Sequence, residues 1–100
     1  MQEMVYRVTL QAPLGERLGE LRLNVDDGNC EGTLDIMRFS NRVKGTLDER
    51  GHCHLTGQLR TLLHTRSFEG EGMLGDTADI CLHCGPMKLT VSGKRVAQGA

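Results

Sequence analysis

The chain has 100 residues, a mass of 11.0 kDa and a formal net charge of -1 at pH 7. This length suits one small domain, taken as residues 1–100. The near-zero net charge excludes the strongly basic surface that binders of nucleic acid or of anionic membranes carry. Aromatic residues make up 3% of the chain, too few to build stacking surfaces for bases. We therefore expect neither nucleic acid nor a membrane as a partner.

The N-terminal region lacks a charged segment followed by an apolar stretch, and no run of apolar residues reaches the length of a membrane span. We therefore expect a cytoplasmic protein. Its four cysteines fall short of the density of a disulfide scaffold and are expected to be reduced thiols. They are Cys30, Cys53, Cys81 and Cys84.

A Gly-x-Leu unit occurs five times, at intervals of 12 to 15 residues. The units begin at Gly19, Gly32, Gly45, Gly57 and Gly72. This period is too short for helical repeats but suits one strand and one turn of an antiparallel meander.

Apolar and polar residues alternate around these units, which is typical of strands with one buried face. Between them lie turn motifs, such as Asp26-Asp27-Gly28-Asn29, that supply glycine for a positive φ. The pattern predicts about eight strands, near residues 4–11, 20–25, 30–36, 42–48, 52–60, 67–74, 78–83 and 87–92.

The glycine of each unit shares a face with the leucine two residues later, so both are expected to point inward. Inward glycines at matching heights favour strand bending, and each leaves unfilled volume near mid-strand. We predict an all-β fold, a small antiparallel meander closing into a barrel. A two-sheet β-sandwich is the alternative, and a β-solenoid ranks third.

If the turns are interpreted correctly, inward residues must face inward residues across each hairpin. The expected opposite pairs are Val25 with Cys30, Leu23 with Gly32, Leu47 with Cys53, Gly45 with Leu55, Leu59 with Phe68, and Gly57 with Gly70.

Two segments hold clusters of metal-ligand residue types: His52-Cys53-His54 and Cys81-Leu82-His83-Cys84. The Cys-x-x-Cys-Gly spacing at residues 81–85 resembles one knuckle of a zinc ribbon. No second Cys-x-x-Cys is present, so the remaining two ligands would have to come from His52, Cys53 or His54. We expect no cofactor, with zinc bound by Cys81, Cys84, His52 and His54 as the alternative.

The same segment suggests two thiol chemistries. Cys81 and His83 share a strand face and could form a nucleophile and its base, although the sequence shows no orienting acid or oxyanion pocket. A redox pair of Cys81 and Cys84 would require Cys81 at a helix N-terminus, where the helix dipole lowers the thiol pKa. This segment is instead predicted to be a strand. The sequence therefore favours a protein that is not an enzyme.

Three arginines continue the inward parity past the ends of predicted strands: Arg17, Arg38 and Arg66. If those ends converge on one barrel mouth, the arginines would form a cationic rim suited to a small amphipathic anion. The alternative is that they extend into water or pair with carboxylates at the loop ends.

Val5, Met37, Leu62 and Met73 fall on the outward parity or in turns, and they suggest a homodimer through an outer sheet face or an edge. The alternative is scattered exposed apolar residues.

The function expected from the sequence is that of a non-catalytic binding or accessory domain for a small amphipathic ligand or a protein partner. The alternative is a small zinc-binding protein or a Cys/His-dependent enzyme.

Metal analysis separates these classes. Protein purified without a chelator is expected to contain no stoichiometric zinc. One zinc per chain, lost when Cys81→Ser and Cys84→Ser are combined, would contradict this prediction.

Overall fold

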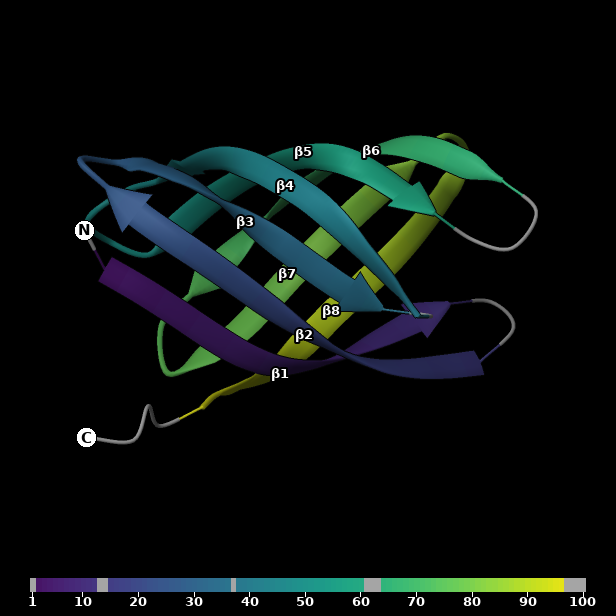
Figure 1. Ribbon diagram of the computed structural model, residues 1–100, viewed down its shortest axis with the longest axis horizontal. Coiled ribbons are helices and arrows are strands. Elements are labelled where there is room, and N and C mark those ends of the chain that lie inside the picture. The colour runs from purple at the N-terminus through teal and green to yellow at the C-terminus, as the bar shows by residue number, and fades with distance from the viewer. Residues whose placement is uncertain (1, 13–14, 37, 61–63, 97–100) are drawn as a thin grey trace.

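Side-chain burial alternates along eight stretches of the chain, and each stretch is a strand in the computed structural model (Figure 1). The structure describes residues 2–12, 15–36, 38–60 and 64–96. The strands are β1 (Gln2–Ala12), β2 (Gly15–Asp26), β3 (Asn29–Ile36), β4 (Phe39–Leu47), β5 (His52–Arg60), β6 (Thr65–Leu74), β7 (Thr77–Cys84) and β8 (Met87–Arg95). The described residues contain no helix long and apolar enough to cross a membrane.

Each strand pairs antiparallel with the next, and β8 pairs with β1 to close the ring. The closing ladder runs from Tyr6 opposite Arg95 to Gln11 opposite Thr90. The expected all-β meander closing into a barrel is therefore confirmed. The two-sheet sandwich is excluded because hydrogen-bonded pairing continues around the whole circumference.

Most of the expected register is confirmed. Val25 lies opposite Cys30 in the β2–β3 hairpin, and Leu47 lies opposite Cys53 in the β4–β5 hairpin. The pairs of Leu23 with Gly32 and of Gly45 with Leu55 are also as expected.

The expected register of the β5–β6 hairpin is wrong. Leu59 lies opposite Arg66 rather than Phe68, and Gly57 lies opposite Phe68 rather than Gly70. β5 ends at Arg60 as expected, but β6 begins at Thr65, two residues before its expected start, and the partner of each residue is shifted by two positions. A shift of two preserves the side-chain parity, so inward residues still meet inward residues.

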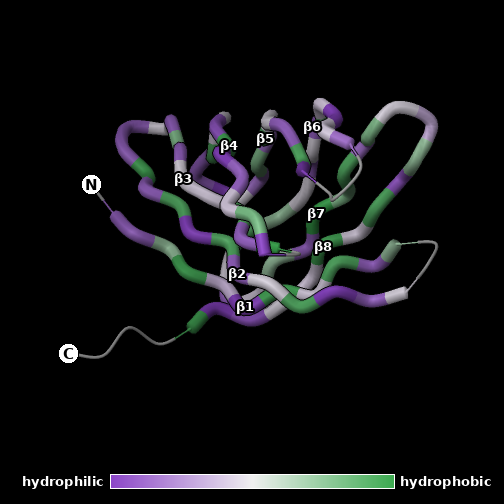
Figure 2. Tube along the Cα trace, turned by 45° about the vertical axis from the view of Figure 1, so that its right-hand side comes forward, coloured by the Kyte–Doolittle hydropathy of each residue, from purple (hydrophilic) through white to green (hydrophobic). Residues whose placement is uncertain are grey.

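The barrel interior is occupied by the protein's own side chains. All eight strands contribute to one cluster of buried residues, and the alternation of apolar and polar positions is visible along the chain in Figure 2. Four of the five repeated leucines are buried and Leu47 packs against the cluster. An eight-stranded barrel is just wide enough for side chains to fill it.

The inward glycines do not leave unfilled volume, contrary to expectation. A Cβ built on Gly45 would lie 1.7 Å from the carbonyl oxygen of His54, and one on Gly32 would lie 1.8 Å from that of Arg22. The backbone of the neighbouring strand therefore occupies the space that a side chain would need. These glycines allow adjacent strands to approach closely where the sheet bends.

The amide side chain of Asn41 is buried at one end of the core. Asn41 is 2% exposed; its Nδ2 donates to the carbonyl oxygen of Leu34 at 3.0 Å, and its Oδ1 accepts from the backbone N–H of Arg60 at 2.9 Å. The described pairing of β4 with β5 extends from Leu47 opposite Cys53 to Val43 opposite Gly57. The Asn41 side chain thus connects the two strands beyond that point.

Four apolar residues were expected at the surface, and of the two that the structure describes, Val5 was predicted incorrectly. It is buried although it has outward parity, because the chain after β8 lies beside it, where the N–H of Val96 donates to the Val5 carbonyl. Met73 is 41% exposed, while Met37 and Leu62 lie outside the described residues.

Closure predicts that substitution at an inward glycine is costly. Gly45→Ala should lower the free energy of unfolding by about 3 kcal/mol, because β4 and β5 must separate to accept the methyl group. Urea unfolding at pH 7 measures this difference. Gly75→Ala is the matched control, since nothing lies within 4 Å of its Cβ position, and it should change stability by less than about 0.5 kcal/mol. Equal effects at both positions would contradict the proposed role of close approach.

Candidate functional site

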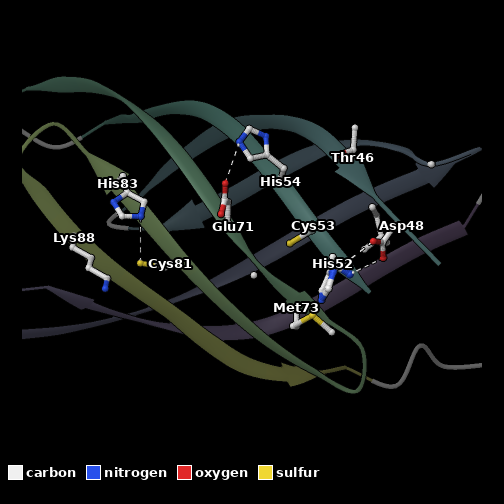
Figure 3. A pocket seen from close by; sticks show the side chains of 13 residues that line it. Thr46, Asp48, His52, Cys53, His54, Glu71, Met73, Cys81, His83 and Lys88 are labelled. Atoms are coloured by element: carbon white, nitrogen blue, oxygen red, sulfur yellow. Dashed lines mark hydrogen bonds and ion pairs between the residues drawn. The ribbon is translucent and has the colours of Figure 1, made fainter. Parts of the chain in front are cut away.

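An open hollow of about 950 Å³ lies on the outer surface over β5, β6 and β7 (Figure 3). We call it the histidine groove, after its lining by His52, His54, Glu71, Met73, Cys81 and His83. All six side chains come from outward positions of the three strands, so the alternation that buries leucines on one face places these groups on the other.

The floor of the groove is formed where β6 and β7 approach each other. A Cβ on Gly72 would lie 1.9 Å from the carbonyl oxygen of Asp79, so only glycine permits this approach. Gly72 and the buried Cys53 both line the groove. The bend that glycine allows in the barrel wall therefore also shapes the site.

A histidine–carboxylate contact spans the upper part of the groove. The Nε2 atom of His54 lies 2.8 Å from Oε1 of Glu69 and 4.0 Å from Oε1 of Glu71. The two glutamate side chains are 64% and 75% exposed. Water screens such exposed pairs, so the contact orients the imidazole without contributing much to stability.

The lower edge of the groove is held by the turn between β4 and β5. The Oδ1 atom of Asp48 accepts from the N–H of Arg50 at 2.8 Å and from the N–H of His52 at 2.9 Å. Desolvation opposes the effect of these hydrogen bonds, yet the net result is a lowered pKa for Asp48. The ionised carboxylate thus helps to set the position at which β5 and His52 begin.

Cys81 is the cysteine of this protein whose side chain reaches the groove with partial exposure. Its Sγ lies 3.8 Å from Nε2 of His83 on the same strand face. The other thiols, of Cys30, Cys53 and Cys84, are buried. Desolvation raises the pKa of Cys30, and raises that of Cys53 to about 11, where proximity to Cys30 adds to the effect.

The four residues considered for zinc do not come together. Cys84 points into the core and is 1% exposed, whereas Cys81 faces outward, because a spacing of three residues along a strand places side chains on opposite faces. His52 and His54 face outward on β5, separated from β7 by β6. Within the described part of the chain, no group of three or more His, Cys, Asp or Glu residues is arranged to hold a metal ion.

The three arginines of the expected rim do lie at one end of the barrel. Arg17 is near the start of β2, Arg38 is in the β3–β4 turn, and Arg66 is near the start of β6. All three are exposed, and Arg17 donates to the carbonyl oxygen of Glu16. The core cluster occupies the interior beneath them, so they surround a filled barrel rather than an open cavity.

The structure brings to the groove two residues that the sequence did not assign to a binding or metal site. Met73 presents an apolar side chain at the groove, and Lys88 supplies a cation opposite His83 across β7 and β8. Glu71 is exposed, and it lies opposite Cys81 and beside His54. These residues lie on different strands and become neighbours only through strand pairing. Their proximity therefore cannot be inferred from the sequence until the register is known.

Comparison of the chain with known protein families, curated proteins and solved structures finds no match. The function is therefore argued from the geometry of the barrel alone.

Burial and geometry predict selective thiol chemistry. In the folded protein, a thiol-reactive reagent such as iodoacetamide should modify Cys81 rapidly and the other three cysteines slowly, whereas all four should react in denaturant. Mass spectrometry of the alkylated chain measures the sites and rates. His83→Gln should slow modification of Cys81, because it removes the imidazole that can take up the thiol proton.

Cys81→Ser is the control, since it should abolish the rapid phase. Rapid modification of Cys84 in the folded protein, or formation of a Cys81–Cys84 disulfide without unfolding, would contradict the placement of the two thiols on opposite faces.

Proposed function

We propose that this protein is a non-catalytic binding module that holds a protein partner on its outer sheet surface. The carrying observation is that the barrel interior is occupied by one cluster of core side chains, while an open groove with varied chemistry lies outside. A ligand carrier of this fold needs an interior space, whereas a partner on the outer surface needs only an accessible face.

The content of the histidine groove suits a polypeptide surface. Met73 offers apolar contact, Glu71 and Lys88 offer opposite charges, and the His54 imidazole is oriented by Glu69. Mixed apolar and polar groups of this kind are usual at the contact surfaces of non-obligate complexes.

The same groups are poorly arranged for catalysis. A thiol enzyme needs its base to be oriented and its transition state to be shielded from water. Near Cys81 and His83, the carboxylates of Glu69 and Glu71 are largely exposed, and the groove is open to solvent. We therefore favour binding over a Cys/His-dependent reaction.

A different polypeptide, rather than a second copy, is the partner we propose. The expectation of a homodimer depended on outward apolar residues, and Val5 is buried. Among the described residues of that set, Met73 alone contributes exposed apolar surface. Reduced thiols at all four cysteines fit a cytoplasmic location for this complex.

Photo-crosslinking from Cys81 tests the proposal. Protein labelled on this thiol with a benzophenone maleimide should give one predominant adduct in an extract of the source cells, and excess unlabelled protein should compete for it. Unlabelled protein carrying Glu71→Lys and Met73→Asp should compete about tenfold less well, because both changes lie in the groove.

The control carries Cys81→Ser with Arg7→Cys, which moves the label to an exposed site on β1 outside the histidine groove. It should give no such adduct. Equal adducts from both positions, or none from Cys81, would overturn binding in the groove. Saturable binding of a fluorescent fatty acid at one molecule per chain would overturn the exclusion of an interior ligand.

A further inference from the structure

The outer surface over β3, β4 and β5 contains a second hollow, of about 780 Å³. Figure 1 shows these three strands side by side. The hollow is lined by half-buried backbone at Gly32 and Gly57 and by the exposed side chains of Arg42, Lys44 and Arg60. We call it the basic groove.

The three cations of the basic groove have no carboxylate partner. Among the described residues, no ion pair or side-chain hydrogen bond involves the side chains of Arg42, Lys44 or Arg60. Glu31 is the one carboxylate among the described residues that line the groove. The lining therefore has an excess of positive charge in a protein whose formal net charge is -1, and it attracts anionic groups.

The spacing of two of these cations matches an extended chain. Arg42 and Lys44 are successive outward residues of β4. Two residues along a strand span roughly 7 Å, and alternate side chains of any extended peptide have the same spacing. Carboxylates at alternate residues of such a peptide can therefore face both cations at once.

Each of these two cations lies beside a threonine. Thr33 lies opposite Arg42 on β3, and Thr56 lies opposite Lys44 on β5. Within the described structure the Thr33 hydroxyl has no hydrogen bond, and the Thr56 hydroxyl donates to the Lys44 carbonyl oxygen at 3.4 Å. Both hydroxyls are half-buried donors that can reach a carboxylate held by the neighbouring cation.

The basic groove is continuous with the histidine groove. Thr46 and His54 line the histidine groove, and Lys44 and Thr56 are the next outward residues on the same two strands. A partner segment that follows β4 from Thr46 to Arg42 thus passes from one groove into the other. The structure describes every residue of β3, β4 and β5 along this path.

We propose that the basic groove binds an extended acidic segment of the protein partner, with aspartate or glutamate at alternate positions facing Arg42 and Lys44. The guanidinium and the ammonium group donate to the two carboxylates. Glu31 lies opposite Lys44 and opposes this attraction. The inference rests on the proposed function in taking the partner to be a polypeptide, and it names the chemistry of the segment that leaves the histidine groove.

A nucleic acid fits this surface less well. The row of outward residues that crosses the barrel at Lys44 has Glu31 on β3 and Glu69, opposite Thr56, on β6. A long polyanion that crosses the strands would meet these carboxylates. A short acidic segment that follows β4 passes between them.

Titration with two peptides, followed by NMR of the isotope-labelled protein, tests the proposal. The peptides share one composition of aspartate and threonine, which alternate in one peptide and form separate blocks in the other. The alternating peptide should shift the amide resonances of Thr33, Arg42, Lys44 and Thr56. It should bind about fivefold more tightly than the block peptide, because alternate carboxylates face both cations. Added salt should weaken the binding of both peptides.

Substitutions separate the basic groove from general charge effects. Arg42→Gln combined with Lys44→Gln should weaken binding of the alternating peptide about tenfold, and Glu31→Gln should strengthen it about threefold. The matched control is Arg7→Gln combined with Lys94→Gln, which removes two exposed cations that lie opposite each other on β1 and β8. It should leave peptide binding unchanged. Circular dichroism of each variant verifies folding.

The proposal is overturned if the alternating peptide shifts none of the groove resonances, if the block peptide binds equally well, or if the control pair weakens binding as much as the groove pair. It is also overturned if an oligothymidylate of the same charge binds more tightly than the alternating peptide.

Crosslinking from Cys81 separates this inference from the proposed function. Unlabelled protein with Arg42→Gln and Lys44→Gln should compete about tenfold less well for the Cys81 adduct. Full competition by this variant would retain the histidine groove and reject the basic groove. Peptide binding without any Cys81 adduct would reject the histidine groove and retain the basic groove.

Discussion

Close approach of neighbouring backbones at inward glycines is the constraint on which this barrel depends. At Gly32, Gly45, Gly72 and Gly93 the adjacent strand's carbonyl oxygen occupies the place where a Cβ would be, at 1.7 to 1.9 Å. Strands of 8 to 12 residues can then curve enough for β8 to pair with β1. The same approach removes the volume that the missing side chains would leave. The close approach at these glycines therefore accounts both for the closure of the barrel and for its filled interior. A closed barrel with a filled interior leaves its outer surface as the place where a partner can bind.

Two buried polar groups hold the ends of the barrel. The hydroxyl of Tyr6, which is fully buried, donates to the Gly75 carbonyl at 2.6 Å and joins β1 to the turn between β6 and β7. Desolvation raises the pKa of Tyr6, so this hydroxyl remains a neutral donor. At the opposite end, Asn41 links β3 and β5 through the Leu34 carbonyl and the Arg60 N–H. Each contact satisfies backbone groups where the ladders end, and their loss would leave those groups unpaired in the core.

Parity and turn chemistry were sufficient to predict the strands and most pairings, because short glycine-containing turns leave little freedom of register. The connection between β5 and β6 has no such motif, and there the expected pairing differed by two residues. The alternation of side chains along a strand also explains why Cys81 and Cys84, three residues apart, lie on opposite faces of β7. The burial of Val5 and the contacts of Asn41 depend on segments distant in the sequence, so no local pattern could have indicated them.

A closed barrel has free edges only where adjacent strands differ in length. β3 has 8 residues and β2 has 12, and within the described residues the pairing of β2 with β3 extends from Asp26 to Gly19. Exposed strand edges carry a risk of unspecific pairing, which short length and charged residues limit. The start of β2 has both features, in Glu16 and Arg17, and it also carries Leu18, whose side chain is 80% exposed. The charges of Glu16 and Arg17 thus limit unspecific pairing at a place where an apolar side chain meets solvent.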